Sequence, residues 1–217
     1  FIRNRGQLFT YTSEGKRVTE SFYDLCKRNE FQRSWLTPLK ILCDKRQVEF
    51  ISTPTSEKGI KDLCSIDCKY VKNGSDYLTH TQLICAMAES GMEVILSTGM
   101  ADQGDIDAAV KALGEAYPEK TTLLHCTSNY PTQPTDTNLE RMVGLKEIYN
   151  TAVGFSDHTQ SWQAAIQAIT LGASMIEKHF TLDHNLPGPD HWFSSTPDEL
   201  IELVIEIRQA EVRLGSK

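Results

Sequence analysis

The sequence contains no apolar run that approaches the ~20 residues needed to cross a bilayer, and it opens with no signal-peptide pattern. We therefore expect no membrane-spanning helix and a cytoplasmic protein. No run of like charges reaches five residues, and the formal net charge is -7. Because a negative chain repels nucleic-acid phosphates, we expect no nucleic-acid partner, although a locally basic site could still bind an anion. A start at Phe1 rather than Met is consistent with an internal piece of a longer product.

Paired CxxC spacings, internal repeats, low-complexity segments and a linker to a second domain are missing as well. The six cysteines lie mostly within apolar stretches, which predicts buried, reduced thiols. Cys64 and Cys68, four residues apart on a predicted helix, are the one pair that merits inspection. Hydrophobic residues make up 40% of the chain, enough for one substantial core, so we expect residues 1–217 to form a single α/β domain.

From about residue 48 onward, short β-branched runs alternate with longer amphipathic segments. Several of the runs are almost continuously apolar, which is typical of parallel strands covered on both faces. The predicted strands are 48–53, 70–75, 93–98, 121–126, 152–156 and 174–180. The predicted helices are 79–90, 105–117, 138–149, 161–171 and 197–214, with an earlier one at 32–46.

This succession of β-α units indicates a parallel sheet with right-handed crossovers, which fits both a doubly wound sheet and a (β/α)8 barrel. Polar residues follow the ends of many different strands, as in a barrel, whereas a doubly wound sheet gathers them at one switch point. We therefore predict a (β/α)8 TIM-type barrel. Such a barrel needs eight strands, so its first two β-α units are missing from this chain or not recognisable in residues 1–47. Residues 7–12 look more like a loop than a strand.

Two histidines and a glutamate lie at the ends of the last two predicted strands. FSDHT (155–159) places His158 just past a strand end, and IEKHF (176–180) places Glu177 and His179 two residues apart. Residues two apart in a strand face the same side, so these groups can converge at a barrel mouth. Neutral imidazoles beside a carboxylate suit a divalent cation, which we favour here. A lone histidine in an apolar strand, in contrast, often makes one backbone hydrogen bond and binds nothing.

Three serines end predicted strands and suit a phosphate group. They are Ser75, Ser97 and Ser156, and Lys72 lies three residues before the first of them. Hydroxyls, backbone N–H groups and an ammonium can together hold a dianion. Each serine alone could equally form a turn or cap a helix, so this interpretation depends on the barrel fold to bring the three together.

Two predicted loops could contact a substrate. LPGPDHWFSS (186–195) carries Asp190, which could bind a polar substrate, transfer a proton or only stabilise a rigid turn. Tyr130 follows HCTSN in another loop that we expect to face the substrate.

With FSDHT, IEKHFTLD, LPGPDH and HCTSNYP together, the chain resembles the N-acetylneuraminate (sialic acid) synthase family. That family includes legionaminic and pseudaminic acid synthases and a spore-coat polysaccharide branch. STPTS (52–56), VKNGSDYLT (71–79) and LSTGM (96–100) extend the match from about residue 48 to the end of the chain. Seven motifs in the family's order are specific, because a generic barrel would not supply them.

The resemblance implies a (β/α)8-barrel transferase that joins phosphoenolpyruvate to an N-acetylated hexosamine, such as N-acetylmannosamine, and releases a nonulosonate and phosphate. It implies a Mn2+ or Mg2+ ion bound by His158 and His179, with Glu177 transferring a proton or orienting water. Lys72 and Asp190 are implied as further catalytic residues. The implied substrate contacts are Thr53 and Lys72 for the phosphoenolpyruvate carboxylate, Ser75, Ser97, Ser128 and Ser156 for its phosphate, and Tyr130 and Asp190 for the sugar.

Parts of the family pattern do not occur in this chain. They are the glutamate of the first strand, the KFQ-type motif of the second, and the C-terminal antifreeze-like domain that reaches into the partner's site in the family's swapped homodimer. Two alternatives therefore stay open. One is condensation onto a different aldose, and the other is a truncated barrel that binds sugar or phosphate without catalysis.

Overall fold

The chain forms one six-stranded parallel sheet in which every strand lies beside its neighbour in sequence, in the order β3-β4-β5-β6-β7-β8. The computed structural model describes residues 4–13 and 15–215, so the ends of the predicted 1–217 domain and residue 14 lie outside the described residues. The strands of this sheet are β3 (Ile51–Ser52), β4 (Tyr70–Asn73), β5 (Glu93–Ser97), β6 (Thr121–Cys126), β7 (Ala152–Asp157) and β8 (Met175–Lys178). All six strands predicted from the sequence are present.

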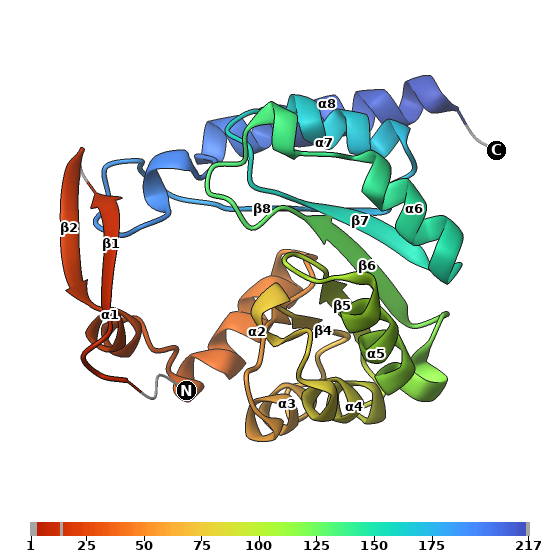
Figure 1. Cartoon of the computed structure of the whole chain (residues 1–217), viewed down its shortest axis with the longest axis horizontal. Coiled ribbons are helices and arrows are strands. Elements are labelled where there is room, and N and C mark those ends of the chain that lie inside the picture. Colours follow the sequence, from red (N-terminus) through yellow and green to blue (C-terminus); the bar gives the residue numbers. More distant parts are fainter. Residues whose placement is uncertain (1–3, 14, 216–217) are drawn as a thin grey trace.

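Helices alternate with these strands and cover one side of the sheet. Figure 1 shows the sheet strongly curled, with α3 to α5 outside its first half and α6 to α8 outside its second. The helices of the alternation are α2 (Leu36–Lys45), α3 (Glu57–Cys64), α4 (Thr81–Glu89), α5 (Gln103–Leu113), α6 (Glu140–Tyr149), α7 (Gln163–Thr170) and α8 (Pro197–Leu214). The predicted α/β architecture is confirmed. Closure into an eight-stranded barrel is not: within residues 4–13 and 15–215, β3 and β8 are the two edges of the sheet.

The two faces of the sheet differ in chemistry, because alternate residues of a strand point to opposite sides. The apolar core lies between the outer face and the helices. Its strand residues are Val71, Val94, Leu96, Leu123, Val153 and Phe155. The residues that alternate with them, such as Lys72, Ser97 and Ser156, therefore point to the inner side of the curl. The packing that fixes the sheet thus leaves its inner face available for a site.

The N-terminal region corrects the prediction for residues 7–12. Residues 8–12 belong to a strand, β1 (Leu8–Ser13), which pairs antiparallel with β2 (Lys16–Ser21). Strand β2 leads into the unpredicted helix α1 (Phe22–Arg28). Figure 1 shows this hairpin standing apart from the main sheet. Its strands read LFTYTS and KRVTES and bury few side chains, so they lack the apolar signal by which the other strands were predicted.

Other details also differ from the prediction. Helix α4 begins after the predicted residue 79, because the His80 side chain accepts a hydrogen bond from the backbone of Leu83 and caps the helix. All six cysteines are free, Cys64 and Cys68 included, but only Cys68 and Cys126 are buried. Among the described helices, none combines the length and the apolar character that crossing a membrane requires.

Candidate active site

The carboxyl ends of β4 to β8 surround a cavity of about 820 Å³. Ten of the eleven predicted site residues line it. They are Lys72, Ser75, Ser97, Ser128, Tyr130, Ser156, His158, Glu177, His179 and Asp190. Parallel strands bring their carboxyl ends to the same edge of the sheet, and the curl turns these ends toward one another. The cavity has two parts, which we call the serine half (Lys72, Ser75, Ser97, Ser128) and the histidine half (Ser156, His158, Glu177, His179).

The histidine half is held by hydrogen bonds within the protein. The ring of His158 has its Nδ1 at 2.8 Å from the carbonyl oxygen of Thr127, so this nitrogen donates and Nε2 keeps its lone pair. That Nε2 lies 3.3 Å from Oγ of Ser156, and the Ser156 hydroxyl donates to Oε2 of Glu177 at 2.6 Å. The parallel register explains this last contact, because Ser156 and Glu177 are cross-strand partners.

His158 and His179 come close enough to share a ligand. Their ring centroids are 5.3 Å apart, and Nδ1 of His179 lies 3.8 Å from Oδ2 of Asp190. Burial lowers the pKa of His179, partly opposed by the neighbouring Asp190 carboxylate, which favours the neutral imidazole that binds metals.

The imidazoles of His158 and His179 fit a divalent ion that takes its other ligands from water and substrate. No group of three His, Cys, Asp or Glu side chains in the described ranges is arranged to hold a metal by itself. Two imidazoles, one with its second nitrogen fixed by a backbone carbonyl, are a common way to present two ligands. Remaining positions would go to water and substrate oxygens, as a catalytic metal site requires.

The serine half is less completely bonded. Oγ of Ser97 is buried and has no hydrogen-bond partner among the residues that the structure describes. Oγ of Ser75 accepts the backbone N–H of Gly99 at 3.0 Å and lies 3.2 Å from Sγ of Cys126. A Cβ on Gly99 would come within 2.8 Å or less of Ser128 Oγ, Cys126 Sγ and Ser75 Oγ, so the absence of a side chain keeps this corner open. A buried hydroxyl without a partner needs a ligand or water to satisfy it.

Lys72 joins the two halves. Its Nζ lies 3.3 Å from Oε1 of Glu177, and its side chain is 15% exposed. The ammonium places a positive charge beside the serines in a protein that is negative overall, as an anionic substrate requires.

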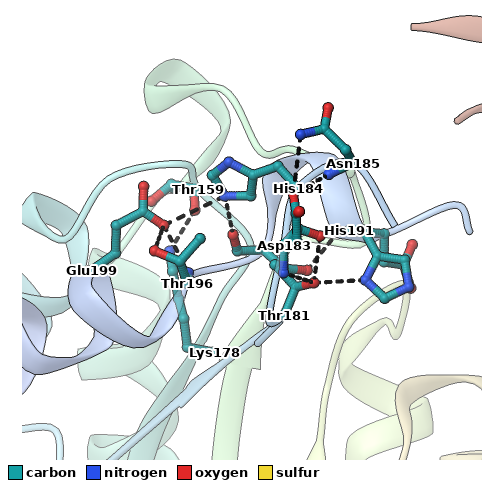
Figure 2. A network of polar contacts seen from close by, with 11 residues as sticks. Thr159, Lys178, Thr181, Asp183, His184, Asn185, His191, Thr196 and Glu199 are labelled. Carbon is teal, nitrogen blue, oxygen red and sulfur yellow. Dashed lines mark hydrogen bonds and ion pairs between the residues drawn. The ribbon is translucent and has the colours of Figure 1, made fainter. Parts of the chain in front are cut away.

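The loop between β8 and α8 brings Asp190 to the cavity and is fixed from two sides. Figure 2 shows Thr181 contacting His191 and Asp183 within this loop; Oγ1 of Thr181 lies 2.7 Å from Nδ1 of His191. From the N-terminal hairpin, Oγ of Ser13 accepts the buried backbone N–H of Gly188 at 3.1 Å. The hairpin therefore braces the loop that carries Asp190.

Tyr130 extends the histidine half. Its ring centroid lies 4.3 Å from that of His158 and 5.6 Å from that of His179. Burial is the main cause that raises the pKa of its hydroxyl, so Tyr130 keeps its proton and can donate a hydrogen bond.

Thr53 is the one predicted site residue outside this cavity. It lines a neighbouring pocket of about 290 Å³ with Arg33 and Pro54. Its Cγ2 lies 3.9 Å from the position of a Cβ on Gly74, so it is close to the serine half without bordering it. The role predicted for Thr53 therefore stays a prediction.

Among the other residues that line the cavity are Cys126 and Phe22, which the sequence did not single out. Cys126 ends β6 beside Ser156 of β7, and the strand-end rule that selected the serines could have selected it too. Phe22 comes from α1, and no pattern in the N-terminal region connects it to the strand ends.

A model of the NeuB family matches residues 2–217. The chain belongs to the NeuB family. It is 43% identical over 195 residues to an uncharacterized protein of Methanocaldococcus jannaschii, covering 90% of this chain and 58% of that protein. It is 37% identical over 210 residues to N,N'-diacetyllegionaminic acid synthase of Legionella pneumophila, covering 95% and 59%. This NeuB-family chain thus spans about three fifths of the length of these curated relatives. The family resemblance inferred from the motifs is confirmed.

Solved structures agree. The N-acetylneuraminic acid (sialic acid) synthetase of Leptospira borgpetersenii, in complex with citrate, superposes with a TM-score of 0.84 at 34% identity, covering 89% of this chain and 67% of that one. A truncated 3-deoxy-D-arabino-heptulosonate 7-phosphate synthase of Thermotoga maritima gives a TM-score of 0.73 at 16% identity, covering 87% and 75%. The second match is a likeness of fold alone.

Proposed function

We propose that this NeuB-family chain carries the reaction centre of a transferase that condenses phosphoenolpyruvate with an N-acetylated hexosamine, N-acetylmannosamine or a related amino sugar, to give a sialic-acid-type nonulosonate and phosphate. One observation carries the proposal: ten predicted residues, from the strands β4 to β8 and the segments that follow them, line a single cavity. Its relative in Legionella pneumophila, named a legionaminic acid synthase, supports it.

The serine half would bind phosphoenolpyruvate. Lys72 and the hydroxyls of Ser75, Ser97 and Ser128 supply the positive charge and the donors that a phosphate and a carboxylate need. Of these groups, Ser75 is held by the Gly99 N–H and Lys72 by Glu177 before a ligand arrives, so these two need little reorganisation when it binds. Tyr130 and Asp190 reach the cavity from loops, as suits contacts to a variable sugar.

The histidine half would carry out the chemistry. C3 of phosphoenolpyruvate forms a bond to the aldehyde carbon of the open-chain sugar, water adds at C2, and the C2–O bond to phosphate breaks. Glu177 would orient this water and accept its proton; the contacts of its carboxylate with the Ser156 hydroxyl and the Lys72 ammonium support this role. His158 and His179 would hold the divalent ion, Mn2+ or Mg2+, which when bound polarises the aldehyde oxygen as a Lewis acid.

Phosphate release from phosphoenolpyruvate tests the proposal. We expect release that requires both a divalent metal and an N-acetylated hexosamine, and that is lost when His158 and His179 are replaced by Ala. His184→Ala is the matched control, because that ring contacts the carbonyl of Ser194 and does not line the cavity. Release that is unchanged in the His158→Ala/His179→Ala variant would remove the metal role.

The open sheet favours a second candidate function, a binding module without turnover. In the described part of the chain the sheet has six strands, whereas a closed barrel has eight, so one side of the cavity lacks the wall that a barrel supplies. Calorimetric binding of phosphoenolpyruvate without any phosphate release would support this candidate. Turnover with an aldose other than an N-acetylated hexosamine, found in a panel of sugars, would instead change the acceptor.

A further inference from the structure

One buried ion pair lies next to the histidine half, at the same two strand ends. Asp157 is fully buried at the end of β7, and Lys178, whose side chain is 7% exposed, ends β8. Their Nζ and Oδ2 atoms are 2.9 Å apart, because the parallel register makes the two residues cross-strand partners. Charges this well buried are costly to keep, so a function for the pair is a reasonable expectation.

The Lys178 ammonium binds more than the carboxylate. It also donates to the backbone carbonyl oxygen of Thr159, as Figure 2 shows, and lies 3.3 Å from that of Ser161. Oδ1 of Asp157, the second carboxylate oxygen, accepts the backbone N–H of Thr159 at 2.8 Å. Together these contacts fix the chain on both sides of His158.

Lys178 also links the ion pair to the cavity, because it lies between two cavity residues at the end of β8. Its neighbours on either side, Glu177 and His179, line the cavity, and part of Lys178 also reaches the cavity wall. Its ammonium, however, is bound to the segment that follows β7. One side chain therefore joins the end of β8, just before His179, to the segment that carries His158.

We propose that Asp157 and Lys178 are positioning residues that fix the distance and orientation between the His158 and His179 rings. This inference rests on the proposed function, in which the two rings hold a divalent ion. Outer groups that orient metal-binding histidines typically change metal affinity by about 10- to 100-fold when removed. The charged groups of the pair bind each other and the backbone of Thr159 and Ser161, so we expect them to act through the two rings.

Removal of the whole pair is the sharpest test. Replacing Lys178 alone would leave a buried uncompensated carboxylate and could prevent folding, whereas Asp157→Asn/Lys178→Met removes both charges together. Lys69→Met/Glu93→Gln is the matched control. That pair also joins two adjacent parallel strands, with Nζ and Oε1 3.6 Å apart, but it is exposed and lies at the opposite end of the sheet.

Two readouts are measured on the full chain. Binding of Mn2+ by calorimetry should weaken at least tenfold in Asp157→Asn/Lys178→Met and stay within twofold in the control. In the metal-free protein, the NMR resonance of the His158 Nδ1 proton, bonded to the Thr127 carbonyl, should broaden or disappear in the first variant only. Circular dichroism confirms that both variants are folded.

The outcomes separate the two proposals. If the wild type binds Mn2+ and the Asp157→Asn/Lys178→Met variant binds it equally well with an unchanged His158 proton, the positioning role is overturned. If the wild type binds no Mn2+, the proposed metal role is wrong, and the NMR resonance of the His158 Nδ1 proton tests the positioning role by itself. Loss of this resonance in the Asp157→Asn/Lys178→Met variant would support the positioning role, and an unchanged resonance would overturn it.

Discussion

The two halves of the cavity satisfy their polar groups in opposite ways. In the histidine half, Ser156 donates to Glu177, and His158 is bonded to Thr127. In the serine half, the buried Ser97 hydroxyl has no partner. The first half is organised by hydrogen bonds within the protein, whereas the second keeps one buried hydroxyl available for a ligand.

This difference suits a reaction in which one substrate is a phosphate ester. A site for a dianion gains affinity from donors that have no competing partner, because binding then replaces no internal hydrogen bond. Groups that transfer protons or hold a cation need a fixed orientation before the substrate binds, which internal hydrogen bonds supply. The following substitutions test this division.

Gly99→Val should have the largest effect, and only on the serine half. The new side chain would occupy the space between Ser75, Cys126 and Ser128, where even a Cβ comes as near as 2.6 Å to another atom. We expect the affinity for phosphoenolpyruvate to fall about 100-fold, or roughly 3 kcal/mol, measured by calorimetry.

Binding of Mn2+ should survive Gly99→Val, because the histidine half is held by separate contacts. The control is Gly144→Ala in α6, where an added Cβ meets no atom within 4 Å and anion affinity should not change. Wild-type phosphoenolpyruvate affinity in Gly99→Val would show that the anion binds elsewhere.

Ser156→Ala should have the next largest effect and reduce stability. It removes a 2.6 Å hydrogen bond to the Glu177 carboxylate, and bonds to charged groups are worth about 1.5–3 kcal/mol. Urea denaturation should show a free energy of unfolding lower by about 2 kcal/mol. Ser174→Ala is the comparison, because its hydroxyl donates at 2.9 Å to a neutral carbonyl oxygen, that of Val153. An equal or smaller loss in Ser156→Ala would contradict the bonding that we assign to the histidine half.

Much of this site could be predicted because a parallel sheet converts sequence order into spatial order. Each strand of β3 to β8 lies next to its predecessor, so polar residues at successive strand ends had to become neighbours. The alternation within the predicted strand 174–180 also indicated that Glu177 and His179 lie on one side. Local pattern and regular topology were sufficient for these residues.

The N-terminal region shows where such prediction fails. Strands β1 and β2 bury little, so neither periodicity nor apolar content distinguishes them from a loop. The contact between Ser13 and Gly188 joins residues 175 positions apart and depends on how the hairpin sits beside the loop. The pairing of Asp157 with Lys178 needs the strand register, which the motifs FSDHT and IEKHF do not specify.

Ser97→Ala should have the smallest effect on stability, and with the opposite sign. The hydroxyl is buried without a partner, so its removal relieves a desolvation cost, and we expect the free energy of unfolding to stay equal or rise by about 1 kcal/mol. Affinity for phosphoenolpyruvate should nevertheless fall about tenfold, because the ligand loses one donor. Thr98→Val, at the next residue, removes a hydroxyl that donates to the Leu124 carbonyl at 3.0 Å, so it should lower stability by about 1 kcal/mol. Urea denaturation of both variants measures the two opposite changes in stability, and calorimetry measures the affinity for phosphoenolpyruvate. A stability loss in Ser97→Ala equal to that in Thr98→Val would show that the Ser97 hydroxyl already has a hydrogen-bond partner without a ligand.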